Sequence, residues 1–427
     1  MFTHEENEML VRVGPGTPTG ELMRRYWLPA LLSEELPRPD CEPVRTKLLG
    51  EDLIAFRDTN GRIGLLDAYC SHRRAPLFFG RNEECGLTCV YHGWKYDIEG
   101  NIVNMPAEPV HSRMKDHLKH RAYPCVEVNG LIMTYMGPSD KKPLLPDLPW
   151  LTLPNNQVCV GSKFLLDCNW LQALEGDNDS IHSAYLHKRG DARGEEALAR
   201  ERPMGSVDID VLPWGVRAAT IYPIDEERVF LRTNTFLMPC IGNTPRGERG
   251  QSPPNGLNPA VHTIYQVPAD DYSNWRYDFE TFFDHPVDDI EAYALAQREE
   301  VDGPSFKKRM NRDNDYLIDR ARQRSGEAYC GIIAGNHTQD AMVTENMGPW
   351  TGPGSITDRT KEHLGATDLH ITQMRNFLLR ALHDMREGLD PPGVAFKPED
   401  NKIHDGARMI TATLPKDKNW KDLLPVS

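Results

Sequence analysis

The 427-residue sequence predicts an α+β protein with a β-rich front domain, and three observations support this fold class. The length exceeds that of one average domain, so two domains are expected. Residues 43–140 contain short apolar runs separated by turn signals such as Thr59-Asn60-Gly61. From about residue 160 onward, strand-like runs alternate with helix-like ones, which is typical of an antiparallel sheet that packs against helices.

The individual elements follow in chain order. The first 40 residues are predicted to be helical, because Thr17 and Pro18 suit an N-cap and a first helical position. The Pro-rich stretch 137–154 is predicted to be a linker. Strands are predicted over 227–239, 262–268 and 271–284, and a helix over 368–388. That helix has Asp368 as its expected cap, Gly388 at its end, and one apolar stripe formed by Ile371, Met374, Leu378, Ala381 and Met385.

Composition and charge limit the function classes. The net charge of −14 argues against a nucleic-acid partner. No run is long enough to cross a bilayer, and the N-terminus lacks the apolar region of a signal peptide, so a cytoplasmic protein with no membrane partner is expected. The nine cysteines are odd in number, and a disulfide framework is therefore not expected.

Two Cys–His pairs stand in the front domain, Cys70 with His72 and Cys89 with His92. A zinc ion takes four such ligands tetrahedrally, although usually as paired cysteines and paired histidines. One thiolate and one imidazole from each loop instead suit an iron–sulfur cluster in which one iron takes both thiolates and the other both imidazoles. Neutral imidazoles reduce the negative charge of such a cluster and raise its reduction potential.

The flanking residues favour the cluster over a zinc knuckle. The stretches "CSHRRAPL" and "CVYHGWKYD" resemble the two loops of Rieske [2Fe–2S] proteins. This resemblance implies that Cys70, His72, Cys89 and His92 are the cluster ligands. It also implies that Pro76, Gly93 and Trp94 shape the loops.

A second group of ionisable residues lies in "NWLQALEGDNDSIHSAYLH" (169–187), which contains Glu175, Asp179, His182 and His187. Two histidines and a carboxylate form the facial triad of non-haem Fe(II) enzymes, which leaves positions open for O2 and substrate. On one regular helix, side chains five residues apart point about 140° apart. We therefore expect a π-type bulge in this segment, because such bulges widen the helix and are frequent at functional sites.

This stretch also resembles the mononuclear-iron motif of Rieske oxygenases. The resemblance implies that Asp179 carries the electron between the iron and His92 or His72 of a neighbouring subunit. The third iron ligand is expected downstream in "GNHTQDAMVTENMGP", which offers Asp340 and Glu345; the resemblance selects Asp340. His337 lies nearby and is a competing ligand.

The resemblance is to the phthalate dioxygenase-like branch and covers most of the chain, including 13–32, 48–58, 312–320 and 340–365. It implies an N-terminal helical segment (1–42) that packs on the catalytic domain, an all-β Rieske domain (43–145) and a helix-grip catalytic domain (146–427). It also implies one Rieske cluster and one Fe(II) per chain, a homotrimer or a dimer of trimers, and a separate NAD(P)H-dependent flavin and iron–sulfur reductase.

The expected reaction is the hydroxylation or O-demethylation of an aromatic compound by O2, with cis-dihydroxylation of an arene as the alternative. Strand alternation places Arg232, Asn234 and Phe236 on one face, and Arg217 is expected on a neighbouring strand. An arginine in an aromatic-lined cavity would bind a carboxylate, so an aromatic carboxylate is the expected substrate. A Rieske electron carrier would explain only the first 140 residues, and a zinc-binding module would not explain Asp179 and its histidines.

Overall fold

The computed structural model describes residues 2–109, 111–189, 204–246, 256–297, 301–303, 305–333, 335–349 and 353–424. Contacts divide the chain into two units, one of residues 13–142 and one of residues 1–12 with 143–427. The predicted boundaries differ from these units for residues 13–42, which lie in the smaller unit because a strand at 27–32 pairs with one at 131–135. Whether the boundaries 43–145 and 146–427 delimit the functional domains stays a prediction.

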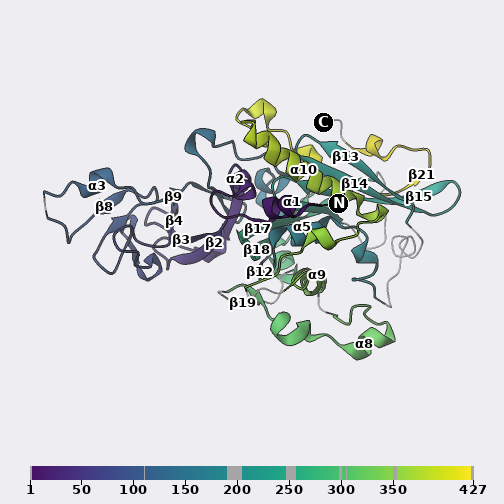
Figure 1. The fold of residues 1–427 in the computed structure, drawn as a ribbon, viewed down its shortest axis with the longest axis horizontal. Helices are drawn as coiled ribbons and strands as arrows, with labels where there is room; N and C mark the ends of the chain where they lie inside the picture. The colour runs from purple at the N-terminus through teal and green to yellow at the C-terminus, as the bar shows by residue number, and fades with distance from the viewer. Residues whose placement is uncertain are drawn as a thin grey trace. The chain divides into compact units, whose positions relative to one another are not determined.

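The smaller unit is built from three small antiparallel sheets (Figure 1). Its sheets have the strand orders β1-β11-β10, β2-β3-β4-β9 and β5-β6-β7-β8. The strands are β1 (Trp27–Leu32), β2 (Val44–Leu48), β3 (Glu51–Arg57), β4 (Ile63–Asp67), β5 (Arg81–Glu83), β6 (Gly86–Thr88), β7 (Lys95–Tyr96), β8 (Ile102–Asn104), β9 (Ala122–Tyr123), β10 (Cys125–Val128) and β11 (Leu131–Tyr135). Two short helices, α2 (Pro18–Met23) and α3 (Met114–His117), complete it.

The larger unit contains one long sheet with the order β13-β14-β15-β16-β17-β18-β12-β20-β19, with β21 paired to β15. These strands are β12 (Val158–Leu166), β13 (Ser206–Leu212), β14 (Gly215–Pro223), β15 (Arg228–Leu237), β16 (Ile241–Arg246), β17 (Ala260–Asp270), β18 (Ser273–Phe282), β19 (Val301–Asp302), β20 (Lys307–Lys308) and β21 (Thr411–Pro415). All pairs are antiparallel except β12 with β20.

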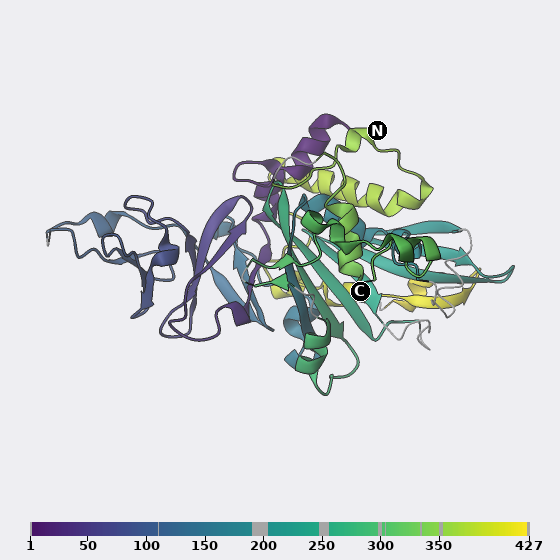
Figure 2. The same cartoon turned by 90° about the horizontal axis from the view of Figure 1, so that it is seen from below.

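Helices pack against this sheet. The helix α5 (Trp170–Asn178) contacts β16 and β17, and α10 (Leu369–Arg386) lies against β13 and β14 (Figure 1). Figure 2 shows α1 (His4–Val11) beside α10. The other α-helices among the described residues are α4 (Pro149–Thr152), α7 (Ile290–Gln297), α8 (Arg320–Ser325) and α9 (Asn336–Thr344). This arrangement of a curved sheet with helices confirms the predicted fold class.

Several predicted elements are confirmed, and two details are wrong. The strands at 228–237, 260–270 and 273–282 and the helix at 369–386 are present. The N-terminal helix that begins at Pro18 ends at Met23, because the following apolar run 27–32 is buried on both faces and pairs with β11 as a strand. Asp368 does not cap α10 with its side chain; its carboxylate accepts a hydrogen bond from Gly365 N instead.

In the described part of the chain, the helices are all too short or too polar to span a bilayer.

Candidate functional site

The four Cys–His residues of the front domain converge on two adjacent loops. Cys70 and Cys89 are 1% and 3% exposed and belong to the hydrophobic core of the smaller unit. The first loop closes through a hydrogen bond from Cys70 N to Ala75 O (2.9 Å). The second loop, between β6 and β7, closes through bonds from Cys89 N to Trp94 O (2.8 Å) and from Gly93 N to Cys89 O (2.9 Å). The loops therefore hold both sulfurs on the buried side.

The two histidines complete this donor set. The rings of His72 and His92 have centroids 4.5 Å apart, and His72 stacks on Trp94 at 4.8 Å with an interplanar angle of 8°. The Nδ1 atom of His72 is buried and has no hydrogen-bond partner among the described residues. Buried ring nitrogens are normally satisfied, and a metal bound at Nδ1 would satisfy this one. Two buried sulfurs and two adjacent imidazoles fit the donor set of a Rieske cluster.

Tyr96 contacts this group from the core. Its Oη lies 2.9 Å from Cys70 Sγ and accepts a hydrogen bond from Ser71 N at 3.1 Å. Burial and the contact with Cys70 raise the pKa of Tyr96, so its hydroxyl stays protonated and would donate to the sulfur of Cys70 if that sulfur bound iron. Burial likewise raises the pKa of the Cys89 thiol. A hydrogen bond to a ligand sulfur offsets the charge of a reduced cluster and tunes its potential.

In the larger unit, His182, His187 and Asp340 come together. His182 Nε2 and His187 Nε2 are 3.3 Å apart, and Asp340 Oδ1 lies 3.5 Å and 3.2 Å from them, respectively. Three ligands about 2.1 Å from one ion, at roughly right angles, are separated by about 3 Å. The spacing thus fits one metal ion, and the donor set of two histidines and one carboxylate suits Fe(II).

The predicted π bulge is wrong, because the helix ends before the histidines. After Asn178 the backbone becomes extended at Asp179 (φ −90°, ψ 109°), and His182 begins a 3₁₀ turn. The backbone N–H of Leu186 then donates to His182 O at 2.7 Å. This reversal, rather than a widened helix, brings His187 back onto His182.

A hydrogen-bonded neighbour orients His187. Its Nδ1 donates to Gln339 Oε1 at 2.7 Å, while Gln339 Nε2 donates to Ile332 O, also at 2.7 Å. The second bond fixes which end of the amide faces the imidazole, so Nδ1 of His187 keeps its proton, and Nε2, which faces His182 and Asp340, is the nitrogen that would give up its proton to bind a metal.

Asp340 is held in its charged form. Burial acts to raise its pKa, but the hydrogen bond to His187 and the charges of His187, His182 and Arg276 outweigh burial and place the pKa well below its usual range. The carboxylate is therefore available as an anionic ligand at any physiological pH.

The two competing downstream ligands have other partners. His337 lies on the first turn of α9, and its Nδ1 is 3.6 Å from Asp278 Oδ2. Glu345 is buried, accepts a hydrogen bond from Asp167 N at 3.0 Å and contacts the Tyr316 hydroxyl. Neither belongs to the group around His182.

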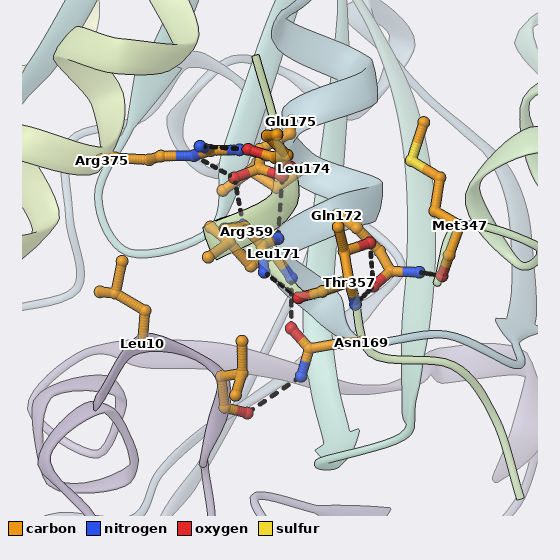
Figure 3. A network of polar contacts seen from close by, with 12 residues as sticks. Leu10, Asn169, Leu171, Gln172, Leu174, Glu175, Met347, Thr357, Arg359 and Arg375 are labelled. Atoms are coloured by element: carbon orange, nitrogen blue, oxygen red, sulfur yellow. Dashed lines mark hydrogen bonds and ion pairs between the residues drawn. The ribbon is translucent and has the colours of Figure 1, made fainter. Parts of the chain in front are cut away.

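The helix α5, which precedes the histidines, is fixed along its length (Figure 3). At its start, the Asn169 side chain caps Leu171 N and donates to Val11 O. Near its end, the Glu175 carboxylate binds Arg359 (Nε 2.9 Å, Nη2 2.8 Å) and Arg375 (Nε 2.7 Å). Burial acts to raise the pKa of Glu175, but the two arginines outweigh it and lower the pKa. This residue, which the sequence placed near the iron motif, therefore holds the helix in place.

A cavity of about 490 Å³, which includes space open to solvent, lies beside the triad. Its described lining is largely apolar, with Asp177, Asp179, Gln266, Arg276 and His337 among the polar groups. The apolar lining includes Phe164, Leu166, Ala173, Leu186, Val343 and Met347.

The substrate residues suggested by the sequence lie outside the described lining of this cavity. Arg217 is buried, donates to Gly406 O at 2.7 Å and lies 3.7 Å from Asp210. Asn234 accepts a hydrogen bond from Ser180 Oγ at 2.7 Å. Phe236 packs edge-on against Phe377 of α10, and Arg232 is half-buried in β15, opposite Thr220 and Thr411.

Sequence reasoning missed the charged residues that do line the cavity. Arg276 Nη1 binds Asp177 Oδ1 at 2.8 Å, and its Nε contacts Asp278 at 3.0 Å. A signal was present, because Arg276, Asp278 and Glu280 alternate along β18 and so share one face of a central strand. Charged residues repeated at this spacing on a buried strand indicate a polar site rather than a core.

Comparisons with known proteins agree with this geometry. The Rieske [2Fe-2S] domain family matches residues 26–121, and the family described as "LigXa C-terminal domain like" matches residues 134–425. The phthalate 4,5-dioxygenase oxygenase subunit of Pseudomonas putida is 35% identical and covers 99% of this chain and 94% of its own length. The 5,5'-dehydrodivanillate O-demethylase oxygenase subunit of Sphingobium sp. is 32% identical, with 94% and 85% covered.

Solved structures show the same fold. Dicamba monooxygenase bound to dicamba aligns with a TM-score of 0.59 at 18% identity, over 86% of this chain and 99% of that one. NdmA of Pseudomonas putida CBB5 gives a TM-score of 0.59 at 18% identity, over 94% and 100%. The chain belongs to the Rieske oxygenases, the family of O2-dependent oxidoreductases that includes the phthalate 4,5-dioxygenase oxygenase subunit.

Proposed function

We propose that this chain is the terminal oxygenase of a Rieske non-haem iron system that hydroxylates or O-demethylates an aromatic compound with an acidic substituent, such as a carboxylate. The observation that carries the proposal is the pairing of two donor sets in one chain. Cys70, Cys89, His72 and His92 would hold a [2Fe–2S] cluster, and a second set would hold mononuclear Fe(II). That second set is His182, His187 and Asp340.

The stoichiometry of the reaction shows which tasks fall to the metal centres and which to the protein residues. Hydroxylation converts R–H, O2, two electrons and two protons into R–OH and water. The metal centres, when bound, supply electron transfer and O2 activation. The protein residues orient the ligands through Gln339, hold Asp340 as an anion and surround the substrate with apolar side chains that exclude water.

Asp179 is proposed as the electron bridge between subunits, with His92 or His72 of a neighbouring chain as its partner. Its Oδ1 accepts hydrogen bonds from Ile181 N (2.7 Å) and His182 N (3.3 Å), and its Oδ2 lies 3.9 Å from His182 Nδ1. The side chain is 31% exposed, so one side can meet a partner. A homotrimer or a dimer of trimers would bring the two centres together.

A separate electron donor is also proposed. Relatives are described as oxygenase subunits, and solved complexes of carbazole 1,9a-dioxygenase contain the oxygenase together with a ferredoxin. For this chain, the electron donor would be an NAD(P)H-dependent reductase that contains a flavin and an iron–sulfur cluster.

Metal analysis tests the two-centre assignment. Anaerobically purified protein should contain three irons and two acid-labile sulfides per chain and give a reduced-Rieske EPR signal after dithionite. The variant H182A should retain two irons, two sulfides and the same EPR signal, whereas C70S should lose both sulfides. If the wild type contained two irons and bound no more after Fe(II) was added, the protein would be an electron carrier and not an oxygenase. Zinc in place of iron would contradict both centres.

The alternative reaction is arene cis-dihydroxylation, which the similarity to the phthalate 4,5-dioxygenase oxygenase subunit favours. Turnover under 18O2 separates the two reactions. A cis-dihydrodiol carries two labelled oxygens, whereas a hydroxylated or demethylated product carries no more than one.

A further inference from the structure

A second group of metal-ligating residue types lies on the inner face of the sheet beside the triad. His262 of β17 places Nε2 3.2 Å from Asp278 Oδ1, and His337 of α9 places Nδ1 3.6 Å from Asp278 Oδ2. The two histidine rings are nearly parallel, with an interplanar angle of 17° and centroids 5.7 Å apart. Each carboxylate oxygen of Asp278 thus faces one imidazole ring.

Hydrogen bonds from His262 and Arg276, with a longer ionic contact to His337, explain this group better than a second metal does. Arg276 Nε lies 3.0 Å and 3.2 Å from the two oxygens of Asp278, whose side chain is 5% exposed. A metal ion on the same oxygens would lie beside the guanidinium in a buried site, where repulsion between cations is strong. Arg276, His337 and His262 outweigh the effect of burial on the pKa of Asp278 and hold it below the usual range, so Asp278 is an anion that positions both rings.

His262 and His337 differ in whether they line the cavity. His337 lines the cavity beside His182 and Asp340, whereas His262 is not part of the described lining. Arg276 also lines the cavity, but Asp177 and Asp278 already balance its charge. An anion that approached Arg276 would meet both carboxylates, so Arg276 is a poor anchor for a substrate acid.

We propose that His337, positioned by Asp278, binds an oxygen substituent of the aromatic substrate, either a carboxylate or a phenolic oxygen; this rests on the oxygenase function proposed above. An oxygen anion transferred from water into a largely apolar cavity loses its hydration and needs a donor there. An imidazole whose Nδ1 faces a carboxylate can carry a proton on both nitrogens, and its Nε2–H then supplies that donor in a fixed direction. One such polar contact on an apolar wall fixes which carbon of the ring faces the iron ligands.

The test uses 3-chlorobenzoate, 3-chlorophenol and 3-chlorotoluene. All three share a chlorinated ring, and at the other substituted carbon they carry a carboxylate, a hydroxyl and a methyl group, respectively. Dissociation constants are measured by calorimetry on the anaerobic, fully metal-loaded protein. H337L should weaken 3-chlorobenzoate binding roughly tenfold to a hundredfold, as expected for the loss of a hydrogen bond to a charged group. Its affinity for 3-chlorotoluene should not fall, and H337Q, which retains a donor, should recover part of the loss.

H262L is the matched control, because it removes the other imidazole of the same cluster without changing the described cavity wall. It should bind 3-chlorobenzoate within about threefold of the wild type. Equal losses in H262L and H337L would overturn the proposal, since the cluster would then act only by holding the fold together. So would unchanged acid binding in H337L, or a fourth metal ion per chain that is lost with His337.

The same experiment separates this inference from the proposed function. Three irons per chain and oxidation of an aromatic substrate, together with tight binding of 3-chlorotoluene and weak binding of the acid and the phenol, would refute the role of His337 and leave the oxygenase assignment in place.

Discussion

Replacement of Gln339 by leucine should weaken the mononuclear metal site without affecting the cluster. The Gln339 side chain is buried and makes two hydrogen bonds of 2.7 Å, one as acceptor from His187 Nδ1 and one as donor to Ile332 O. Q339L removes both bonds, whereas Q339E keeps an acceptor for His187 and removes only the donor to Ile332. The pair of variants therefore separates the orientation of the ligand from the stability of the fold.

The expected changes in metal affinity and in unfolding free energy follow from these contacts. Loss of a partner that orients a ligating histidine typically costs about 10- to 100-fold in metal affinity. Loss of the Gln339 donor leaves the Ile332 carbonyl with only the Cys330 Sγ contact at 3.8 Å and costs about 1–3 kcal/mol of unfolding free energy in both variants. The Fe(II) dissociation constant, measured by competition with a chelator, should rise in Q339L and rise much less in Q339E, while the Rieske EPR signal stays constant. Equal loss of iron affinity in the two variants would refute the orienting role.

Three further outcomes are expected. E175Q should lower the free energy of unfolding in urea by about 3–5 kcal/mol, because Arg359 would be left without its buried anion and Arg375 would keep only Glu362; a loss below about 1 kcal/mol would contradict this. Because the folded pKa of Glu175 is lowered, its contribution should be fully present above the unfolded pKa of about 4.3 and should shrink as the pH falls below it, so the difference between wild type and E175Q should decrease in acid. G93A should lower sulfide occupancy and stability more than G61A. Both glycines have positive φ (76° and 79°), but only at Gly93 would a Cβ lie 2.6 Å from a proline side chain.

The grouping of the four Cys–His residues was predictable because the residues that shape their loops are sequence neighbours. Cys70, His72, Cys89 and His92 lie on two short loops, and the residues that shape each loop are its sequence neighbours, such as Gly93 and its hydrogen bond to Cys89 O. The spacing therefore predicted that the four side chains would lie on two short loops, and the resemblance of the flanking residues to Rieske loops supplied the proposed donor set.

The grouping of the proposed iron ligands was predictable from the sequence, but the backbone that carries them was not. His182 and His187 lie five apart, which conflicts with one face of a helix, and two backbone solutions can resolve that conflict. The structure uses a chain reversal after Asn178, where Asp179 Oδ1 accepts the N–H groups that the ended helix leaves open. Tertiary contacts decide between the two solutions, and periodicity carries no information about them.

The residues that line the cavity were the least predictable, for a different reason. Alternation along β15 separates the two faces of the strand, but it does not say which strand of a long curved sheet passes beside the proposed metal ligands. That position belongs to β17 and β18, because α5 and α9 pack over this part of the sheet and carry the triad. Asn234 contacts the segment that carries His182 and His187, through Ser180.

The last turn of α5 shows how distant parts of the fold position the segment that carries the proposed iron ligands. Glu175 and Asp177 are two residues apart and so point to opposite sides of the helix. Glu175 is held by Arg359 and Arg375, and Asp177 by Arg276 and by Gln266 Nε2 at 2.6 Å. The helix is thus fixed on both sides immediately before the residue at which it must end. Because buried ion pairs add specificity of position more readily than net stability, we interpret these charges as the reason that the turn carrying His182 begins at one defined place.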